Sequence, residues 1–177
     1  MKSFPVPTRE EVSSGNQQIF DNLKKAVGFV PNLYAVMALS EHALGNYLAL
    51  TSGKSSLKAK EKEVVNLVVS QYNHCRYCLS AHTKFAKLNG FSDDQVLEIR
   101  KSQISFDSKL DALARVVKSI VENKGHAAPE ILDSFFAAGY TDENLLDAII
   151  LVGDKTITNY LHAITKVPID WEVAPEL

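Results

Sequence analysis

The segment that decides the fold is LKAKEKEVVNLVVSQYNHCRYCLSAH, residues 57–82. Its first part predicts a helix over about 57–73, because from Val64 onward apolar side chains cover most of the helical surface. The polar residues that remain follow one stripe at i, i+3, i+7 and i+10, namely Glu63, Asn66, Ser70 and Asn73. A largely buried helix with one polar stripe commonly faces a site or a water-filled crevice. A glutamate after LKAKEK is ordinarily solvated, but here the stripe favours Glu63 as a base or proton relay.

The second part, HCRYCLSAH, contains the only two cysteines of the chain. If residues 74–82 are helical, Cys75, Cys78 and His82 fall at i, i+3 and i+7 and share one face. Helical residues three apart have Cα atoms within the ~4.4 to 6.8 Å that a disulfide tolerates. The spacing therefore predicts a cysteine pair that can be oxidised and reduced reversibly.

Spacing alone does not decide which of the two sulfurs attacks first. Asn73 can cap the helix, which places Cys75 in its first turn, where the positive end of the helix dipole lowers the pKa of a thiol. His82 follows Cys78 by four residues and can take its proton directly or through a water. Both assignments are open at this point.

Helix punctuation continues along the rest of the chain. Two capping boxes are predicted, at Thr8 with Glu11 and at Ser92 with Gln95, and Thr141 can cap the last long helix. No stretch alternates with a period of two between hairpin turns, so no strand is expected. The sequence therefore predicts an all-α protein in which residues 1–177 form a single domain.

An internal repeat emerges when residues 57–99 are laid over 106–148 at an offset of 49. Gly90-Phe91-Ser92-Asp93 then meets Gly139-Tyr140-Thr141-Asp142, and apolar positions also coincide. The polar positions differ, since Glu63, Cys75, Cys78 and His82 fall on Ala112, Lys124, Ala127 and Ile131. We interpret the second copy as a scaffold without the chemical residues, with chance matching of helical sequences as the alternative.

Composition excludes several classes of protein. Two cysteines three residues apart cannot build a framework of long-range disulfides. The net charge is −2 without a basic stripe, so nucleic acid is not an expected partner. No apolar stretch reaches the ~18 residues that span a bilayer, and MKSFPVPTREE has no apolar core of a signal peptide. We expect a cytoplasmic protein that has no membrane partner.

The spacing Glu63, Cys75, Cys78, His82 resembles the E-x11-C-x-x-C-x-x-x-H signature of the AhpD-like alkylhydroperoxidases, within the carboxymuconolactone decarboxylase superfamily. Two flanking segments, VPNLYAVMALS at 30–40 and TNYLHAITKVPIDW at 158–171, resemble peroxidase-related members. The resemblance implies an AhpD-like helical bundle with an internal repeat. It also implies a homotrimer or a homohexamer, and the long apolar helix at 142–166 can supply an oligomer face.

The same resemblance implies a thiol-dependent peroxidase and disulfide oxidoreductase acting on alkyl hydroperoxides. It makes Cys78 the peroxidatic thiol, Cys75 the resolving thiol, and His82 with Glu63 the proton relay. No cofactor or metal is implied, and the expected reductant is a thiol or a dihydrolipoyl-type protein. Tyr77 departs from the pattern, because well-studied members carry a second histidine there. A shorter relay and a larger share of disulfide reduction are the expected consequences.

Two other functions compete with this one. His74, Cys75, Cys78 and His82 offer two nitrogens and two sulfurs to a metal, although His74 would point away from the shared face. A non-catalytic helical oligomerisation or regulatory module with a redox-sensing or metal-binding CxxC is the other alternative. In the last helix the polar stripe Lys155, Asn159, His162 and Lys166 holds one more histidine, which we interpret as a surface residue outside the site.

Overall fold

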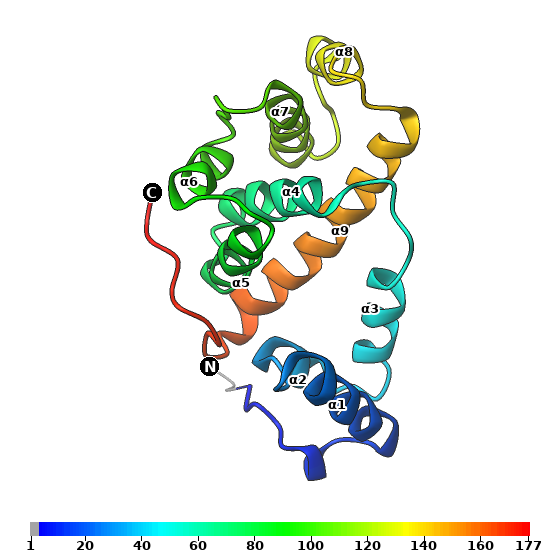
Figure 1. The fold of residues 1–177 in the computed structure, drawn as a ribbon. Coiled ribbons are helices and arrows are strands. Elements are labelled where there is room, and N and C mark those ends of the chain that lie inside the picture. The colour runs from blue at the N-terminus through cyan, green and yellow to red at the C-terminus, as the bar shows by residue number, and fades with distance from the viewer. Residues whose placement is uncertain (1–3) are drawn as a thin grey trace. The chain divides into compact units, whose positions relative to one another are not determined.

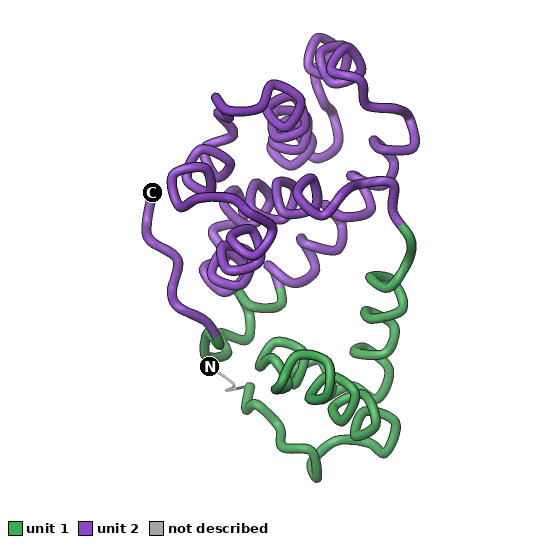
Figure 2. The backbone as a smooth tube through the Cα atoms, viewed as in Figure 1, with its two compact units in different colours: residues 1–54, 161–170 green, residues 55–160, 171–177 purple. Residues whose placement is uncertain are grey.

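The computed structural model describes residues 4–177, and all its regular elements are helices (Figure 1). No strand occurs within residues 4–177, which confirms the predicted all-α class. The chain divides into two compact units, drawn in two colours in Figure 2. Residues up to 54 form the first unit with 161–170, and residues 55–160 form the second with 171–177. The single domain therefore stays a prediction.

The first unit holds a 3-10 helix at Arg9–Glu11 and helices α1 (Ser14–Val27), α2 (Asn32–Met37) and α3 (Ala43–Thr51). The predicted contact of Thr8 with Glu11 is present, with the Thr8 N–H donating to the carboxylate at 2.7 Å. It precedes only the 3-10 turn, because the hydroxyl of Ser13 accepts from the Asn16 N–H and α1 starts there. The core of this unit is Val12, Phe20, Ala35, Met37, Ala38, Leu44 and Tyr47.

The second unit is built around α4 (Ala59–Tyr72), which packs against α5 (Arg76–Leu88), α6 (Asp93–Lys101) and α7 (Ser108–Glu122) (Figure 1). Its remaining helices are α8 (Pro129–Ala137), which contacts α7, and α9 (Asp142–Thr165), whose last turn belongs to the first unit. Val64, Val65 and Leu67 of α4 are fully buried, as the apolar pattern of this helix predicts.

Two helix starts repeat with the offset of 49 residues that the sequence alignment uses, whereas α8 starts 53 residues after α5. Helix α7 starts 49 residues after α4, and α9 starts 49 residues after α6. Gly90 and Gly139 end the helices that precede α6 and α9, with φ values of 87° and 86°. A side chain is strained in this left-handed region, so glycine suits both positions.

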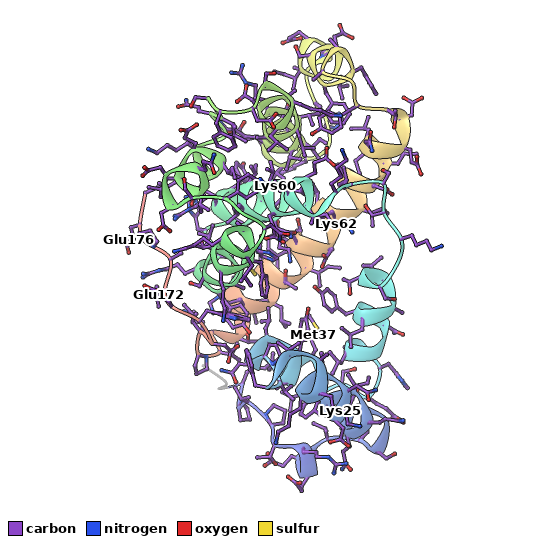
Figure 3. The ribbon with its side chains drawn as sticks, viewed as in Figure 1. Lys25, Met37, Lys60, Lys62, Glu172 and Glu176 are labelled. Atoms are coloured by element: carbon purple, nitrogen blue, oxygen red, sulfur yellow. The ribbon has the colours of Figure 1, made fainter. Side chains whose placement is uncertain are left out.

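The C-terminal segment of the second unit, residues 171–177, packs along α5. The Ala174 N–H donates to the Ser80 hydroxyl at 3.0 Å, and the Trp171 ring meets the Tyr77 ring edge-on at 5.2 Å. Figure 3 labels Glu172 and Glu176 on this segment, and Glu176 lies 3.4 Å from Arg76. None of the helices described in the structure is both long and apolar enough to cross a membrane.

Candidate active site

Cys75 and Cys78 lie at the start of α5, and both are free thiols that are 3% exposed. Cys75 is the N-cap residue, and its sulfur accepts from the Cys78 N–H at 3.5 Å. Asn73 is instead the C-cap residue of α4, so the prediction that Asn73 caps the start of α5 is wrong. The reason is a tight turn at His74, whose φ of 52° lets the Cys75 N–H donate to the Ser70 carbonyl. Cys78, and not Cys75, therefore occupies the first turn of α5.

Glu63 of α4 and His82 of α5 are brought together across the two helices. Nδ1 of His82 lies 2.8 Å from Oε2 of Glu63, and the two side chains are only 13% and 11% exposed. The other carboxylate oxygen accepts from the Asn66 side-chain amide at 3.4 Å. With its Nδ1–H donated to the carboxylate, His82 keeps Nε2 for proton exchange with a reacting group. Glu63 is therefore part of a buried pair and not a solvated residue.

Helix α9 contributes buried polar residues to the surroundings of the cysteine pair. Lys155, Thr158 and Asn159 are buried, at 6%, 3% and 1% exposure. The Asn159 side chain donates to the Ser70 hydroxyl at 3.3 Å and accepts from Asn73 at 3.0 Å. The Thr158 hydroxyl donates to the Lys155 carbonyl at 2.9 Å and also lies within hydrogen-bonding reach of the Cys78 sulfur. The one hydroxyl proton can serve either acceptor.

The surroundings lower the pKa of Cys78 well below that of an ordinary thiol. The largest cause is the hydrogen bond from the Cys75 thiol, and the charges of Lys155 and His82 add to it. Burial acts in the opposite direction. The pKa of Cys75 is raised, chiefly because its proton is held in that same hydrogen bond and because the sulfur is buried. Together with its place in the first turn of α5, this makes Cys78 the sulfur that ionises first.

Tyr77, between the two cysteines, is buried by the C-terminal segment. Its ring contacts Trp171, which in turn meets the Phe85 ring at 6.1 Å, and Phe85 lies 5.7 Å from the His82 ring. The position held by a second histidine in well-studied members is thus a packing position in this protein, within a row of aromatic rings.

The structure also shows site residues that sequence reasoning did not assign. Lys155 and Asn159 belong to the polar stripe noted in the last helix, and Thr158 lies beside them. The signal was present as a polar stripe, but nothing in the sequence pairs it with a motif some eighty residues earlier. His162 of the same stripe is half-buried, not at the surface, and its Nε2 lies 3.2 Å from the Val167 carbonyl oxygen.

No cluster of three or more histidine, cysteine, aspartate or glutamate side chains within residues 4–177 is arranged to bind a metal. His74 lies outside α5, in a left-handed turn, and lines a cavity that Cys75, Cys78 and His82 do not line.

The sequence profile of the carboxymuconolactone decarboxylase family matches residues 37–118, which include all four predicted site residues. No curated protein has a significant sequence match to the chain. Among solved structures, a peroxidase-related protein from Silicibacter sp. TM1040 is similar with a TM-score of 0.82 at 19% identity. It covers 94% of this chain, and the similarity extends over 90% of that protein.

A peroxidase-related protein with an AhpD core from Ralstonia eutropha JMP134 has a TM-score of 0.85 at 16% identity, covering 94% of this chain and 91% of its own. The debrominase Bmp8, solved in complex with 2,3,4-tribromopyrrole, has a TM-score of 0.78 at 15% identity and covers 96% of this chain and 92% of its own. At such identities the likeness shows the AhpD-like fold. The family profile matches residues 37–118, the segment that carries the motif.

Proposed function

We propose that this protein is a CxxC thiol peroxidase and disulfide oxidoreductase that reduces alkyl hydroperoxides. The observation that carries the proposal is the environment of Cys78. Its sulfur lies in the first turn of α5 and accepts a hydrogen bond from Cys75. The charges of Lys155 and His82 also lower the pKa of Cys78. A thiolate at neutral pH is the nucleophile that attacks a peroxide.

The reaction proceeds in three balanced steps. The Cys78 thiolate attacks the terminal oxygen of ROOH, the O–O bond breaks, and RO⁻ takes a proton from His82 to leave as the alcohol. The thiol of Cys75 then attacks the sulfenic acid on Cys78, which forms the disulfide and releases water. A dithiol reductant returns two electrons and two protons and becomes a disulfide itself. Glu63 orients His82 through the 2.8 Å contact between its Oε2 and Nδ1 of the ring.

The fold alone does not select the substrate, because peroxidase-related proteins and a debrominase share it. The paired cysteines favour peroxide or disulfide substrates, since both reactions end in a Cys75–Cys78 disulfide that a dithiol can reopen. Replacement of a relay histidine by Tyr77 favours a substantial disulfide-reductase activity besides the peroxidase activity.

The test is a stoichiometric one on the reduced protein. One equivalent of cumene or tert-butyl hydroperoxide is expected to consume two thiols per peroxide, yield the alcohol, and leave an internal disulfide visible by peptide mass spectrometry. Dihydrolipoamide should restore both thiols. Trp171 fluorescence follows the reaction in real time, because Trp171 touches Tyr77 beside Cys78. Thiols that react no faster than free cysteine at pH 7 would remove the protein from this class.

The proposed assembly is a homotrimer or a homohexamer, formed through α9. Five large apolar side chains on the part of α9 in the second unit are 45% to 63% exposed: Leu146, Ile149, Ile150, Ile157 and Tyr160. Successive members are separated by one, three or seven residues, spacings that keep all five on one side of the helix as an apolar stripe. An apolar stripe of this length on a helix is typical of a contact between copies.

Light scattering at micromolar concentration tests the assembly. We expect a mass of three or six times 19.5 kDa, reduced by Ile150→Glu and unaffected by Glu143→Gln, a change in the first turn of the same helix. A wild-type protein with the mass of one chain would contradict the assembly and leave the proposed chemistry standing.

A further inference from the structure

A cationic cavity lies in the second unit, at the ends of α4 and α6, apart from the cysteine site. Its volume is about 460 Å³, and its lining residues are Val68, Gln71, Tyr72, His74, Arg100, Lys101, Ser102 and Lys118. The lining contains two lysines, an arginine and a histidine but no carboxylate. None of the four residues proposed for the thiol chemistry lines it.

Arg100 is the central feature of this cavity. The residue is only 4% exposed, and its Nε donates to the Gln71 side chain at 2.8 Å. Its Nη1 is buried without a hydrogen-bond partner. A guanidinium carries its charge at every ordinary pH, and a buried charge is normally paired with an anion. Burial is the cause of the lowered pKa of Arg100, with no carboxylate offsetting it.

The helix ends explain part of this charge but not all of it. Arg100 and Lys101 occupy the last turn of α6, where cations interact favourably with the helix dipole. That interaction accounts for an exposed lysine at this position. It does not supply an acceptor to the buried Nη1 of Arg100, and it does not explain why Lys118 of α7 faces the same space.

We propose that this cavity binds a small oxyanion, a carboxylate or a phosphate group, with Arg100 as the principal donor and Lys118, Lys101 and His74 as further cationic contacts. Carboxylate and phosphate oxygens are the acceptors that match the planar donors of arginine. The Ser102 hydroxyl adds a neutral donor, and Val68 and Tyr72 provide an apolar wall for the carbon skeleton that carries the anion. The proposal does not depend on the proposed peroxidase function.

The cavity is connected through the backbone to the cysteine pair. His74 lines the cavity and is bonded directly to Cys75, the N-cap residue of α5. The ligand therefore contacts the turn that connects α4 to the cysteine pair, without touching either sulfur.

The test is a titration of the reduced protein with inorganic phosphate and, separately, with succinate, at constant ionic strength. Amide ¹H–¹⁵N spectra report where binding occurs. We expect saturable shifts at residues 71–74 and 100–102 for one of the two probes, and the tighter probe identifies the anion as phosphate or carboxylate. Shifts that do not saturate, or that lie outside this cavity, would overturn the proposal.

Two variants of α7 provide a matched comparison. Lys118 and Arg115 are both exposed cations with a carboxylate one helical turn away, Glu122 for Lys118 and Asp111 for Arg115. Only Lys118 lines the cavity. Lys118→Gln should weaken binding about 2- to 5-fold, the usual effect of one charged contact near a surface, and Arg115→Gln should leave it unchanged. Equal effects of the two variants would mean non-specific attraction. Arg100→Lys, if it folds, should weaken binding further.

Discussion

The two copies of the helical repeat, α4 with α5 and α7 with α8, share their architecture and differ in chemistry. Both begin with a long helix whose apolar side is fully buried, with Val64 and Leu67 in α4 and Leu113 and Val116 in α7 at zero exposure. In the first copy Glu63 and His82 form a buried pair beside Cys78. At the matching positions the second copy has Ala112, Ile131 and Ala127.

The difference separates what the fold requires from what the site requires. Ile131 and Ala127 pack against the main hydrophobic cluster, so the second copy uses these positions for core contacts. In the first copy the same positions hold groups that are costly to bury unless they are paired. The pairing of Glu63 with His82 offsets this cost, so the first copy holds polar groups where the second has core contacts, as the proposed chemistry requires.

The largest expected effect is the loss of sustained peroxide consumption when either cysteine of the first copy is replaced. Cys78→Ser should abolish hydroperoxide consumption, because the attacking sulfur is gone. Cys75→Ser should allow one turnover and leave a sulfenic acid on Cys78 that dimedone traps. Ala127→Ser, at the position of the second copy that matches Cys78, is the control and should keep full activity. A sulfenic acid on Cys75 in the Cys78→Ser variant would reverse the assignment.

The next effect concerns the carboxylate. Glu63→Gln preserves the shape of the side chain but removes the carboxylate charge that lies 2.8 Å from Nδ1 of His82. We expect the reaction of Cys78 with peroxide to slow by about 10²- to 10⁴-fold, the range for a positioned acid or base. In the Cys75→Ser background, the alkylation profile of Cys78 should move to higher pH. Ala112→Gln, the matched change in the second copy, should alter neither, and an unshifted profile in Glu63→Gln would exclude Glu63 from the site.

A smaller effect tests the contribution of α9. Lys155→Met removes a buried positive charge that lowers the pKa of Cys78. With that charge gone the pKa rises, so the thiolate fraction falls at every pH below it. The alkylation profile should move up by about one pH unit, roughly a tenfold lower rate in acidic buffer. Lys84→Met removes an exposed cation of α5 and should leave the profile in place. Equal profiles for the two variants would show that Lys155 has no part in activating Cys78.

Most of the first copy is predictable from local sequence, because its signals are periodic. The apolar run around Val64 predicts a buried helix, and the resemblance to AhpD-like proteins pairs Glu63 with His82, which meet across α4 and α5. The repeat offset is likewise reproduced by the starts of α4 and α7. The buried helix is predictable because its periodicity is a property of one continuous segment.

The parts that could not be predicted depend on the tight turn and on distant segments. The left-handed residue His74 moves the start of α5 and makes Cys75, not Asn73, its cap. Lys155 and Asn159 reach the site from α9, and their polar stripe alone does not say what it faces. The packing role of Tyr77 also depends on a distant residue, because its partner Trp171 belongs to the C-terminal segment.

The smallest expected effect concerns the N-caps of α6 and α9, where the two copies are alike. Ser92 and Thr141 are matching N-cap residues, at the starts of α6 and α9. The Ser92 hydroxyl accepts from the Gln95 N–H at 3.2 Å, and the Thr141 hydroxyl accepts from the Asn144 N–H at 3.3 Å. Each also has a reciprocal bond, since its own N–H donates to the side-chain oxygen of Gln95 or Asn144 at 3.0 Å.

The two caps share these bonds to the backbone, and the Thr141 hydroxyl also donates to Asn144 Oδ1 at 3.0 Å. Ser92→Ala and Thr141→Ala should therefore cost similar free energies of unfolding, about 1 kcal/mol each. Urea titrations followed by Trp171 fluorescence and by helical circular dichroism measure this loss, and the midpoints should fall while the slopes stay constant. Peroxide turnover should remain at the wild-type level in both variants, since neither cap touches the cysteine pair. A difference of more than about 1 kcal/mol between the two would show that equivalent backbone positions are not energetically equivalent, and the repeat would then be one of geometry alone.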